Sequence, residues 1–222
     1  MLKNNEPIWF NTKDKEMAKT QDIRIVDVKP DKEPLKIFVA TPVHDMCTIH
    51  YTRAVLLFQQ ECMKKGVLST YSLLKSSLVQ QGRNLCVSEF LSADMKYDYF
   101  LFIDSDIDFS PETIFTMIEK NKDVIACPYP MKTLNWDKIW RRLHSEAIDK
   151  PDHLMKAGFT FPIKVKDTKN ISVNDGVCEV THAPTGCMLI KRSVFEKMVE
   201  KYPELKINQT TIINGKEATK PN

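Results

Sequence analysis

The 222-residue sequence has no hydrophobic run long enough to cross a membrane and no excess of charge of one sign. Its most apolar stretch, Tyr99 to Ile103, is far shorter than the roughly 18 residues that a membrane-spanning helix needs. The 32 basic and 29 acidic residues leave a net charge of +3, and no basic run interleaved with aromatics indicates a nucleic-acid interface. Residues Met1 to Phe10 lack the apolar core of a signal peptide. We therefore expect a soluble, cytoplasmic protein with no membrane span and no nucleic-acid partner.

The paired cysteines and histidines of a zinc site or a disulfide framework are also missing. The six cysteines stand singly, mostly in apolar segments: Cys47, Cys62, Cys86, Cys127, Cys178 and Cys187. No C-x-x-C pair occurs, and His44 and His50 have no cysteine pair at matching distance. We expect reduced thiols that pack as small hydrophobic side chains, and no structural zinc.

The order of the apolar segments predicts an α/β fold. From Lys36 onward, short apolar runs alternate with segments of helical period, which is the pattern of βαβ units and a mainly parallel sheet. Strands are predicted near 37–40, 67–74, 99–103, 123–127 and 187–190, with helices around 51–62, 87–95, 111–118 and 193–202. The chain length suits a single domain. We assign it to residues 35–203, between a polar N-terminal extension, 1–34, and a polar C-terminal tail, 204–222.

A few residues mark the ends of these predicted elements. Proline cannot continue a central β-ladder, so the first strand is predicted to stop at Pro42. Ser110 and Pro111 have the residue types favoured at a helix N-cap and first turn. Ser193 and Glu196 have the spacing of a capping box. These signals predict where the chain turns from strands into loops and helices.

An acidic cluster, Asp104-Ser105-Asp106, follows directly after the most strand-like run. In a parallel sheet, ligands bind outside the carboxyl ends of the strands, so this position favours a binding role. Two carboxylates held so close repel each other, and a hard divalent cation would compensate that repulsion. Such a cation usually keeps coordination positions for substrate phosphates. The cluster therefore predicts a site for a metal ion and a diphosphate.

The cluster has two other interpretations. Acidic residues after a strand can simply cap the next helix, and this alternative stays open. Asp108 extends the spacing toward that of a calcium-binding EF-hand loop. However, Phe109 stands where that loop requires glycine, and Phe115 stands where it requires a bidentate glutamate. A calcium loop is therefore excluded.

An ordered set of motifs resembles the GT-A fold glycosyltransferases, in particular the virus- and phage-encoded GT-A domains that use an Asp-x-Asp motif. The set is Thr41-Pro42, Arg83-Asn84, Phe102-Ile103-Asp104-Ser105-Asp106, Tyr129-Pro130-Met131-Lys132 and Thr185-Gly186-Cys187-Met188-Leu189-Ile190. The resemblance covers about Lys36 to Tyr202. An Asp-x-Asp alone would be weak evidence, and the order of the motifs carries the resemblance. It implies a Rossmann-like α/β fold with a mainly parallel central sheet flanked by helices.

The resemblance also implies roles in donor binding. Thr41 and Pro42 match the loop that holds the nucleoside, and Arg83 matches an arginine that reaches the nucleotide. A solvated arginine at the start of a helix is an equal alternative for Arg83. Asp104 matches a residue that contacts ribose or a metal-bound water, and Asp106 matches the direct metal ligand. Ser105 lies between these two carboxylates. The implied cofactor is Mn²⁺ or Mg²⁺, since both suit oxygen ligands, and a UDP-sugar is the favoured donor.

On the acceptor side, the resemblance points to Thr185 and Gly186, which match a turn facing that part of the pocket. An ordinary tight turn before a strand remains an equal alternative. Trp136 and Trp140 lie in a segment that could form a lid or an acceptor platform. The alternative there is an amphipathic helix that buries Trp136, Ile139, Trp140 and Leu143 on one side.

The sequence departs from the resemblance where a general base is expected. Inverting members of this fold place an acidic residue after the Thr-Gly segment, and some add a histidine ligand. The only acids after Ile190 are Glu196, Glu200, Glu204 and Glu217, and no histidine follows His182. The catalytic base and the stereochemical outcome are therefore unassigned. The polar stretch from Asn214 to Asn222 shows no terminal element, and we interpret the chain as truncated or as the first part of a longer protein.

Three functions remain compatible with the sequence. The first is a metal-dependent glycosyltransferase that moves a sugar from a nucleoside diphosphate sugar to a glycan or another hydroxyl acceptor. The second is an Asp-x-Asp phosphatase or phosphotransferase. That motif normally opens the first strand of the domain, whereas two strand-like runs precede it here, and no downstream Gly-Asp-x-x-x-Asp loop occurs. The third is a non-catalytic nucleotide-sugar-binding module. Fold alone does not separate them.

Overall fold

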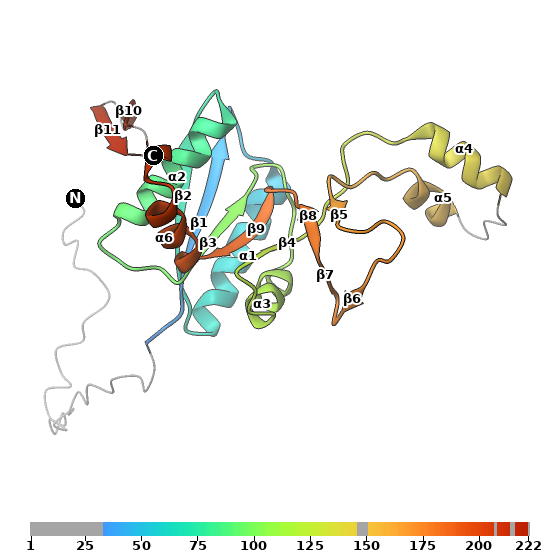
Figure 1. Ribbon diagram of the computed structural model, residues 1–222, viewed down its shortest axis with the longest axis horizontal. Helices are drawn as coiled ribbons and strands as arrows, with labels where there is room; N and C mark the ends of the chain where they lie inside the picture. Colours follow the sequence, from blue (N-terminus) through green and yellow to red (C-terminus); the bar gives the residue numbers. More distant parts are fainter. Residues whose placement is uncertain (1–32, 146–150, 207, 214–215, 222) are drawn as a thin grey trace, which may run out of the picture. The chain divides into compact units, whose positions relative to one another are not determined.

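A computed structural model describes residues 33–145, 151–206, 208–213 and 216–221 of the chain. Of the predicted N-terminal extension, 1–34, residues 1–32 lie outside the described part of the chain. No helix among the described residues is long and apolar enough to span a bilayer. The core is built from residues 34 onward, and its elements are labelled in Figure 1.

The elements that position the site alternate between strand and helix over most of the chain. In order they are β1 (Lys36–Val43), α1 (Ile49–Lys64), β2 (Leu68–Lys75), α2 (Val79–Ser92), β3 (Tyr99–Ile103), α3 (Pro111–Glu119), β4 (Val124–Ala126), β9 (Cys187–Lys191) and α6 (Arg192–Lys201). Between β4 and β9 lie α4 (Trp136–Ser145), α5 (Pro151–Ala157), β5 (Lys164–Val165), β6 (Val173–Asn174), β7 (Val177–Cys178) and β8 (Val180–His182). A short 3-10 helix, η1 (Pro203–Leu205), follows α6.

The central sheet has five strands in the order β2-β1-β3-β9-β4, which confirms the predicted α/β class. Strands β2, β1 and β3 are parallel, whereas β9 runs antiparallel to both β3 and β4. Four of the five strands therefore point the same way, and β9 alone is reversed. The sheet is mixed because β9 arrives after the long α4–β8 excursion, not through a helical crossover that would keep it parallel.

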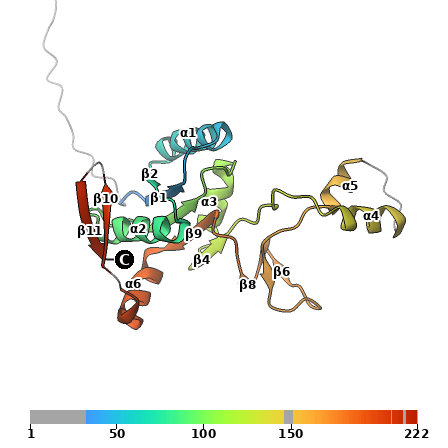
Figure 2. The ribbon, with the colours of Figure 1, turned by 90° about the horizontal axis from the view of Figure 1, so that it is seen from above.

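The two faces of the sheet carry separate hydrophobic clusters, because alternate residues of each strand point to opposite sides. On β1, Ile37 and Val39 join one cluster and Phe38 and Ala40 the other. The first cluster packs under α1 and α3, and the second packs under α2 and α6. Figure 2 shows α1 and α2 on opposite sides of the strands. The second cluster is dominated by aromatic rings, among them Phe38, Phe90, Phe100 and Phe195.

Strand β1 runs through Pro42, so the predicted strand end was wrong. Pro42 pairs in register with Leu74 of β2. The carbonyl of Val43 accepts a hydrogen bond from Ser76 on the β2 side, so the polar groups of Pro42 face the opposite side, toward β3. Pairing between β1 and β3 ends at Ala40. The missing N–H of Pro42 therefore costs no ladder hydrogen bond.

Helix starts agree with the sequence in one case and differ in another. Ser110 caps α3, with its hydroxyl accepting from the backbone N–H of Glu112, and Pro111 occupies the first turn as predicted. The capping box predicted at Ser193 is absent, because α6 begins at Arg192 with no side-chain cap. Glu196 is instead bonded to Arg192 Nε at 2.8 Å. The four-residue spacing of that ion pair on one helix face explains the difference.

The segments outside the central sheet form small units of their own. Helix α4 packs on α5, where Gly158 lies directly against Ile139. Strand β5 pairs with β8, and β6 pairs with β7. In the polar tail, where the sequence showed no terminal element, β10 (Asn208–Ile213) and β11 (Lys216–Pro221) form an antiparallel hairpin.

Candidate functional site

The acidic cluster lies at the point where the strand order of the sheet reverses. The chain passes from β1 outward to β2 and then returns past β1 to β3. Such a reversal opens a crevice at the carboxyl ends of the strands, where α/β proteins bind ligands. Asp104 follows β3 directly, and the backbone carbonyl of Ser105 accepts from the N–H of Thr48, the N-cap of α1. The two loops that border the crevice are thus tied together.

Arg83 of α2 forms an ion pair with Asp104 at this end of the sheet. Its Nη2 lies 3.0 Å from Asp104 Oδ1 and 3.3 Å from Oδ2, and both side chains are about three-quarters buried. The guanidinium also lies over the ring of Phe102, 5.8 Å from its centre. Arg83 Nε is buried and has no hydrogen-bond partner among the described residues. A buried donor without a partner is costly, so an acceptor atom from a ligand would be stabilised beside it.

Gly186, the residue just before β9, lies against the same carboxylate. Its carbonyl accepts from the N–H of Asp104 at 2.9 Å, and its own N–H donates to the hydroxyl of Tyr129 at 3.2 Å. A Cβ at Gly186 would lie 2.7 Å from Asp104 Oδ2 and 2.5 Å from the Tyr129 hydroxyl. Only glycine leaves room for both side chains here. Burial, followed by the negative charge of Asp104, raises the pKa of Tyr129.

Asp106 faces solvent and is paired with a different cation. Lys132 Nζ contacts Asp106 Oδ2, and the lysine side chain is largely exposed. The hydrogen bond to Asp106 and its negative charge raise the pKa of Lys132. Each carboxylate of the Asp-x-Asp motif therefore already has a basic partner from a distant part of the chain.

The donor set suits a hard cation only in part. No group of three or more His, Cys, Asp or Glu side chains that could hold a metal occurs among the described residues. Mg²⁺ and Mn²⁺ need no complete protein cage, since one or two carboxylates and the phosphates of a substrate can supply the oxygens. A cation held by Asp106 would require Lys132 to leave that carboxylate.

Several residues predicted to belong to the site have side chains that make no contact with Asp104 or Asp106 in the interactions described above. Thr41 is fully buried and its hydroxyl is bonded to the hydroxyl of Tyr51 at 2.7 Å, and Pro42 is buried within β1. Thr185 is half-buried in the turn just before Gly186. Trp136 is the first residue of α4 and is 71% exposed. Roles for these four residues in ligand binding remain predictions.

Tyr129 and Lys132 are site residues to which the sequence assigns no individual role. Both lie in the segment that follows β4, far in sequence from the acidic cluster. In the sequence they stand out only as members of the ordered motifs of the resemblance. The sequence does hold one signal for Lys132. Two carboxylates as close as Asp104 and Asp106 require a positive charge nearby, and Lys132 can supply it.

Two of the six free cysteines lie beside this site. The backbone N–H of Cys127 donates to the carbonyl of Cys187 at 2.9 Å, which continues the β4–β9 register by one residue. The neighbouring Cys187 thiol lowers the pKa of Cys127 to about 7, against the opposing effect of burial. The proximity of Cys127, together with burial, raises the pKa of Cys187. All six cysteines are free; Cys62, Cys86 and Cys187 are buried as predicted, whereas Cys47, Cys127 and Cys178 are only half-buried.

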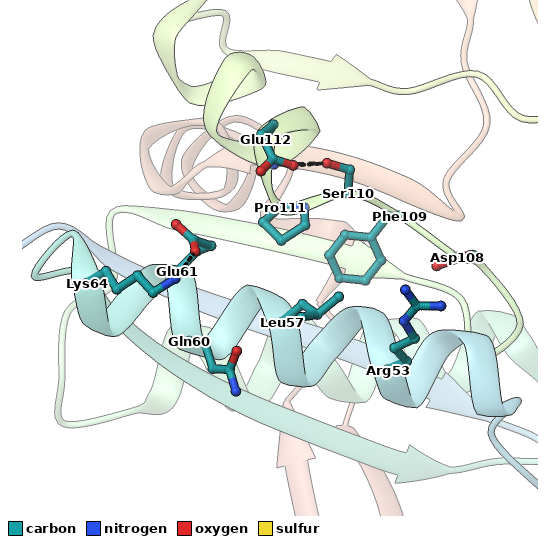
Figure 3. A pocket seen from close by; sticks show the side chains of 10 residues that line it. All are labelled: Arg53, Leu57, Gln60, Glu61, Lys64, Asp108, Phe109, Ser110, Pro111 and Glu112. Atoms are coloured by element: carbon teal, nitrogen blue, oxygen red, sulfur yellow. Dashed lines mark hydrogen bonds and ion pairs between the residues drawn. The ribbon is translucent and has the colours of Figure 1, made fainter.

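A separate cleft of about 530 Å³ lies between α1 and the start of α3 (Figure 3). Asp108 lines it, but neither Asp104 nor Asp106 of the acidic cluster does. The charged groups of the cleft are partly satisfied by its own side chains, since Lys64 bonds to Glu61 at 2.6 Å and the Ser110 hydroxyl donates to the Glu112 carboxylate. We therefore locate the candidate site at the crevice beside Asp104 and not in this cleft.

Comparisons with known proteins add little to the geometry. No family model matches the sequence, and no curated protein matches it. Among solved structures, the chain is similar to a glycosyltransferase involved in the glycosylation of the major capsid of PBCV-1. The match covers 78% of this chain and 68% of that chain at 12% identity, with a TM-score of 0.32. Similarity of this degree carries no argument about function, which must come from the site itself.

Proposed function

We propose that the protein is a metal-dependent glycosyltransferase that transfers a sugar from a nucleoside diphosphate sugar, with a UDP-sugar favoured, to a hydroxyl of a glycan or another acceptor. The observation that carries the proposal is the Arg83–Asp104 pair, three-quarters buried at the strand-order reversal and closed from the other side by Gly186. Such a crevice suits a ligand that brings both a nucleoside and phosphate oxygens.

The chemistry of the residues suits the departure of a diphosphate. When a sugar leaves its nucleotide, negative charge grows on the leaving oxygen and must be neutralised where it forms. Arg83 supplies a planar guanidinium that binds phosphate oxygens in pairs, and its unpartnered Nε offers one further donor. Asp104 and Asp106 would hold Mn²⁺ or Mg²⁺, which supplies Lewis-acid neutralisation of the diphosphate when bound.

Lys132 would compete with a cation for the carboxylate of Asp106. In the structure its ammonium pairs with the carboxylate that the cation would need. Lys132 must therefore leave Asp106 before a cation is held there, and its exposed, flexible side chain can then turn to a phosphate oxygen.

Replacing Lys132 by alanine is expected to strengthen Mn²⁺ binding to the nucleotide-free protein by about two- to fivefold, which is the range for an exposed ion pair. The same variant should bind a nucleoside diphosphate more weakly, since one phosphate contact is lost. Both affinities are measured by calorimetric titration. Lys166→Ala is the matched control, because Lys166 is an exposed lysine paired with Glu179 elsewhere. Unchanged or weaker Mn²⁺ binding in Lys132→Ala would show that the lysine does not compete with the cation.

A thermal-shift comparison of nucleotides tests the proposed function. A ligand that binds only the folded chain stabilises it by roughly 2.7 kcal/mol at a hundred times its dissociation constant, or about 5–10 °C in melting temperature. We expect UDP or a UDP-sugar with Mn²⁺ to produce such a shift, and UDP without metal to produce less. No shift with any nucleotide, combined with hydrolysis of an aryl phosphate, would replace the proposal with a phosphatase. No shift and no hydrolysis would favour a structural module.

A further inference from the structure

Helix α4 exposes a row of large apolar side chains. Trp136 is 71% exposed, Trp140 is 65% exposed and Leu143 is 51% exposed. Their spacing of four and then three residues puts all three on one side of the helix. The sequence allowed the opposite, an amphipathic helix with this side buried, but Ile139 alone of that set is buried. Exposed apolar surface of this kind marks an interaction site.

The exposed row belongs to a helix that is held in place by its other contacts. Asn135 Oδ1 accepts from the backbone N–H of Lys138 at 2.9 Å, which caps the start of α4. Asn135 also donates its backbone N–H to the carbonyl of Gly158 at the end of α5. Ile139 packs directly on Gly158, and the two helices lie side by side in Figure 1. Ile139, at one edge of the same apolar face, thus anchors α4 to α5, whereas the two tryptophans and Leu143 stay exposed.

The remaining faces of α4 are basic. Lys138, Arg141 and Arg142 are exposed, and Asp137 is the one acidic residue of the helix. Trp140 stacks near His144, with 4.2 Å between the ring centres. A helix with tryptophan and leucine on one side and lysine and arginine on the other is suited to the boundary between lipid headgroups and acyl chains, where the rings enter the boundary and the long basic side chains reach the headgroups.

We propose that α4 docks the protein on a membrane surface that contains anionic lipids, with the helix axis in the plane of the headgroups. Charge complementarity selects this occupant, since the polar side of α4 carries three basic side chains against one acidic side chain, and a basic amphipathic helix is attracted to anionic lipids. A sugar would use the tryptophan rings, but it would leave Leu143 without a partner. This inference is independent of the proposed donor site.

Vesicle flotation tests the proposal with the full chain. We expect binding to vesicles that contain phosphatidylglycerol, much weaker binding to pure phosphatidylcholine vesicles, and a blue shift of tryptophan fluorescence on binding. Trp9→Phe removes the third tryptophan, so the signal then comes only from Trp136 and Trp140. The double variant Trp136→Ser, Trp140→Ser should lower vesicle partitioning by about tenfold or more, and the charge reversal Arg141→Glu, Arg142→Glu should remove the preference for anionic lipid.

The matched control changes an equally exposed apolar pair on another helix. Leu56 and Met63 of α1 are 61% and 71% exposed, and Leu56→Ser, Met63→Ser should leave vesicle binding unchanged. Circular dichroism confirms that each variant is folded. Equal binding by the tryptophan double variant and the unchanged protein would overturn the proposal. Failure of the unchanged protein to bind vesicles would also overturn it. If sedimentation then shows a dimer that the tryptophan variant dissociates, the exposed row is a contact between two copies of the chain.

Discussion

Replacing Gly186 by alanine is expected to weaken nucleotide binding by about tenfold and to destabilise the fold by about 1–3 kcal/mol. The added methyl group would lie 2.7 Å from Asp104 Oδ2 and 2.5 Å from the Tyr129 hydroxyl. Both groups must move, and the movement of Asp104 also disturbs its ion pair with Arg83. Calorimetric titration of the nucleotide and chemical unfolding measure the two effects.

A second glycine variant separates loss of the site from loss of stability. A Cβ at Gly158 would lie 2.6 Å from Ile139 Cδ1, in the contact between α4 and α5. Gly158→Ala should therefore destabilise the chain by a similar amount and leave nucleotide affinity unchanged. If both glycine variants bind nucleotide as tightly as the unchanged protein, the crevice beside Asp104 is not the donor site. If both lose binding equally, the loss reports stability and not the site.

Replacing Arg83 by alanine is expected to lower nucleotide affinity by about tenfold to a hundredfold, since a hydrogen bond to a charged group contributes about 1.5–3 kcal/mol. Arg83 is about three-quarters buried, so solvent screens this contact less than a surface ion pair. Arg83→Lys keeps the positive charge but not the planar fork, and it should recover only part of the affinity. Calorimetric titration with UDP and Mn²⁺ gives the comparison.

A double-mutant cycle supplies the control for the Arg83 prediction. Asp104→Ala and Arg83→Ala should not be additive in their effect on nucleotide affinity, because the two side chains share one ion pair. Additive effects would mean that Arg83 acts away from Asp104. An Arg83→Ala variant that binds UDP as tightly as the unchanged protein would remove the arginine from the donor site altogether.

Most of the sheet could be predicted because its strands are short, continuous and buried. The prediction at 99–103 coincides with β3, since five apolar residues in a row have no other simple place than the centre of a sheet. The strand end at Pro42 was wrong for a non-local reason. Whether proline breaks a ladder depends on which neighbour its nitrogen faces, and the sequence does not show where the pairing between β1 and β3 ends.

From local residue patterns alone, only the acidic half of the candidate site was predictable, and Arg83 and Gly186 were named only through the resemblance. Asp104 and Asp106 are adjacent to a strand end and carry a local pattern, whereas their partners come from three other segments. Arg83 precedes Asp104 by 21 residues and Lys132 follows Asp106 by 26. Contacts at such separations are fixed by the sheet order and by the reversal of β9, and no periodicity in the sequence encodes them. The burial of Thr41 against Tyr51 is likewise a tertiary contact.

The exposure of the apolar side of α4 also depends on tertiary contacts that the sequence does not show. The spacing of its apolar residues predicts which side chains share a face, but the helix has an apolar arc wide enough for two contacts. Ile139 at one edge of that arc meets Gly158, and the tryptophans at the other edge do not. The spacing therefore predicts the shared face correctly, whereas the predicted burial of that face was wrong.

The most direct test of the central claim is calorimetric titration of UDP and GDP into the purified chain, with and without Mn²⁺, alongside Asp106→Ala. We expect one nucleotide, UDP in preference, to bind only when Mn²⁺ is present, and we expect the alanine variant to lose this binding while it stays folded. Binding of neither nucleotide under any metal condition, or binding that persists unchanged in Asp106→Ala, would contradict a donor site at the Asp-x-Asp cluster.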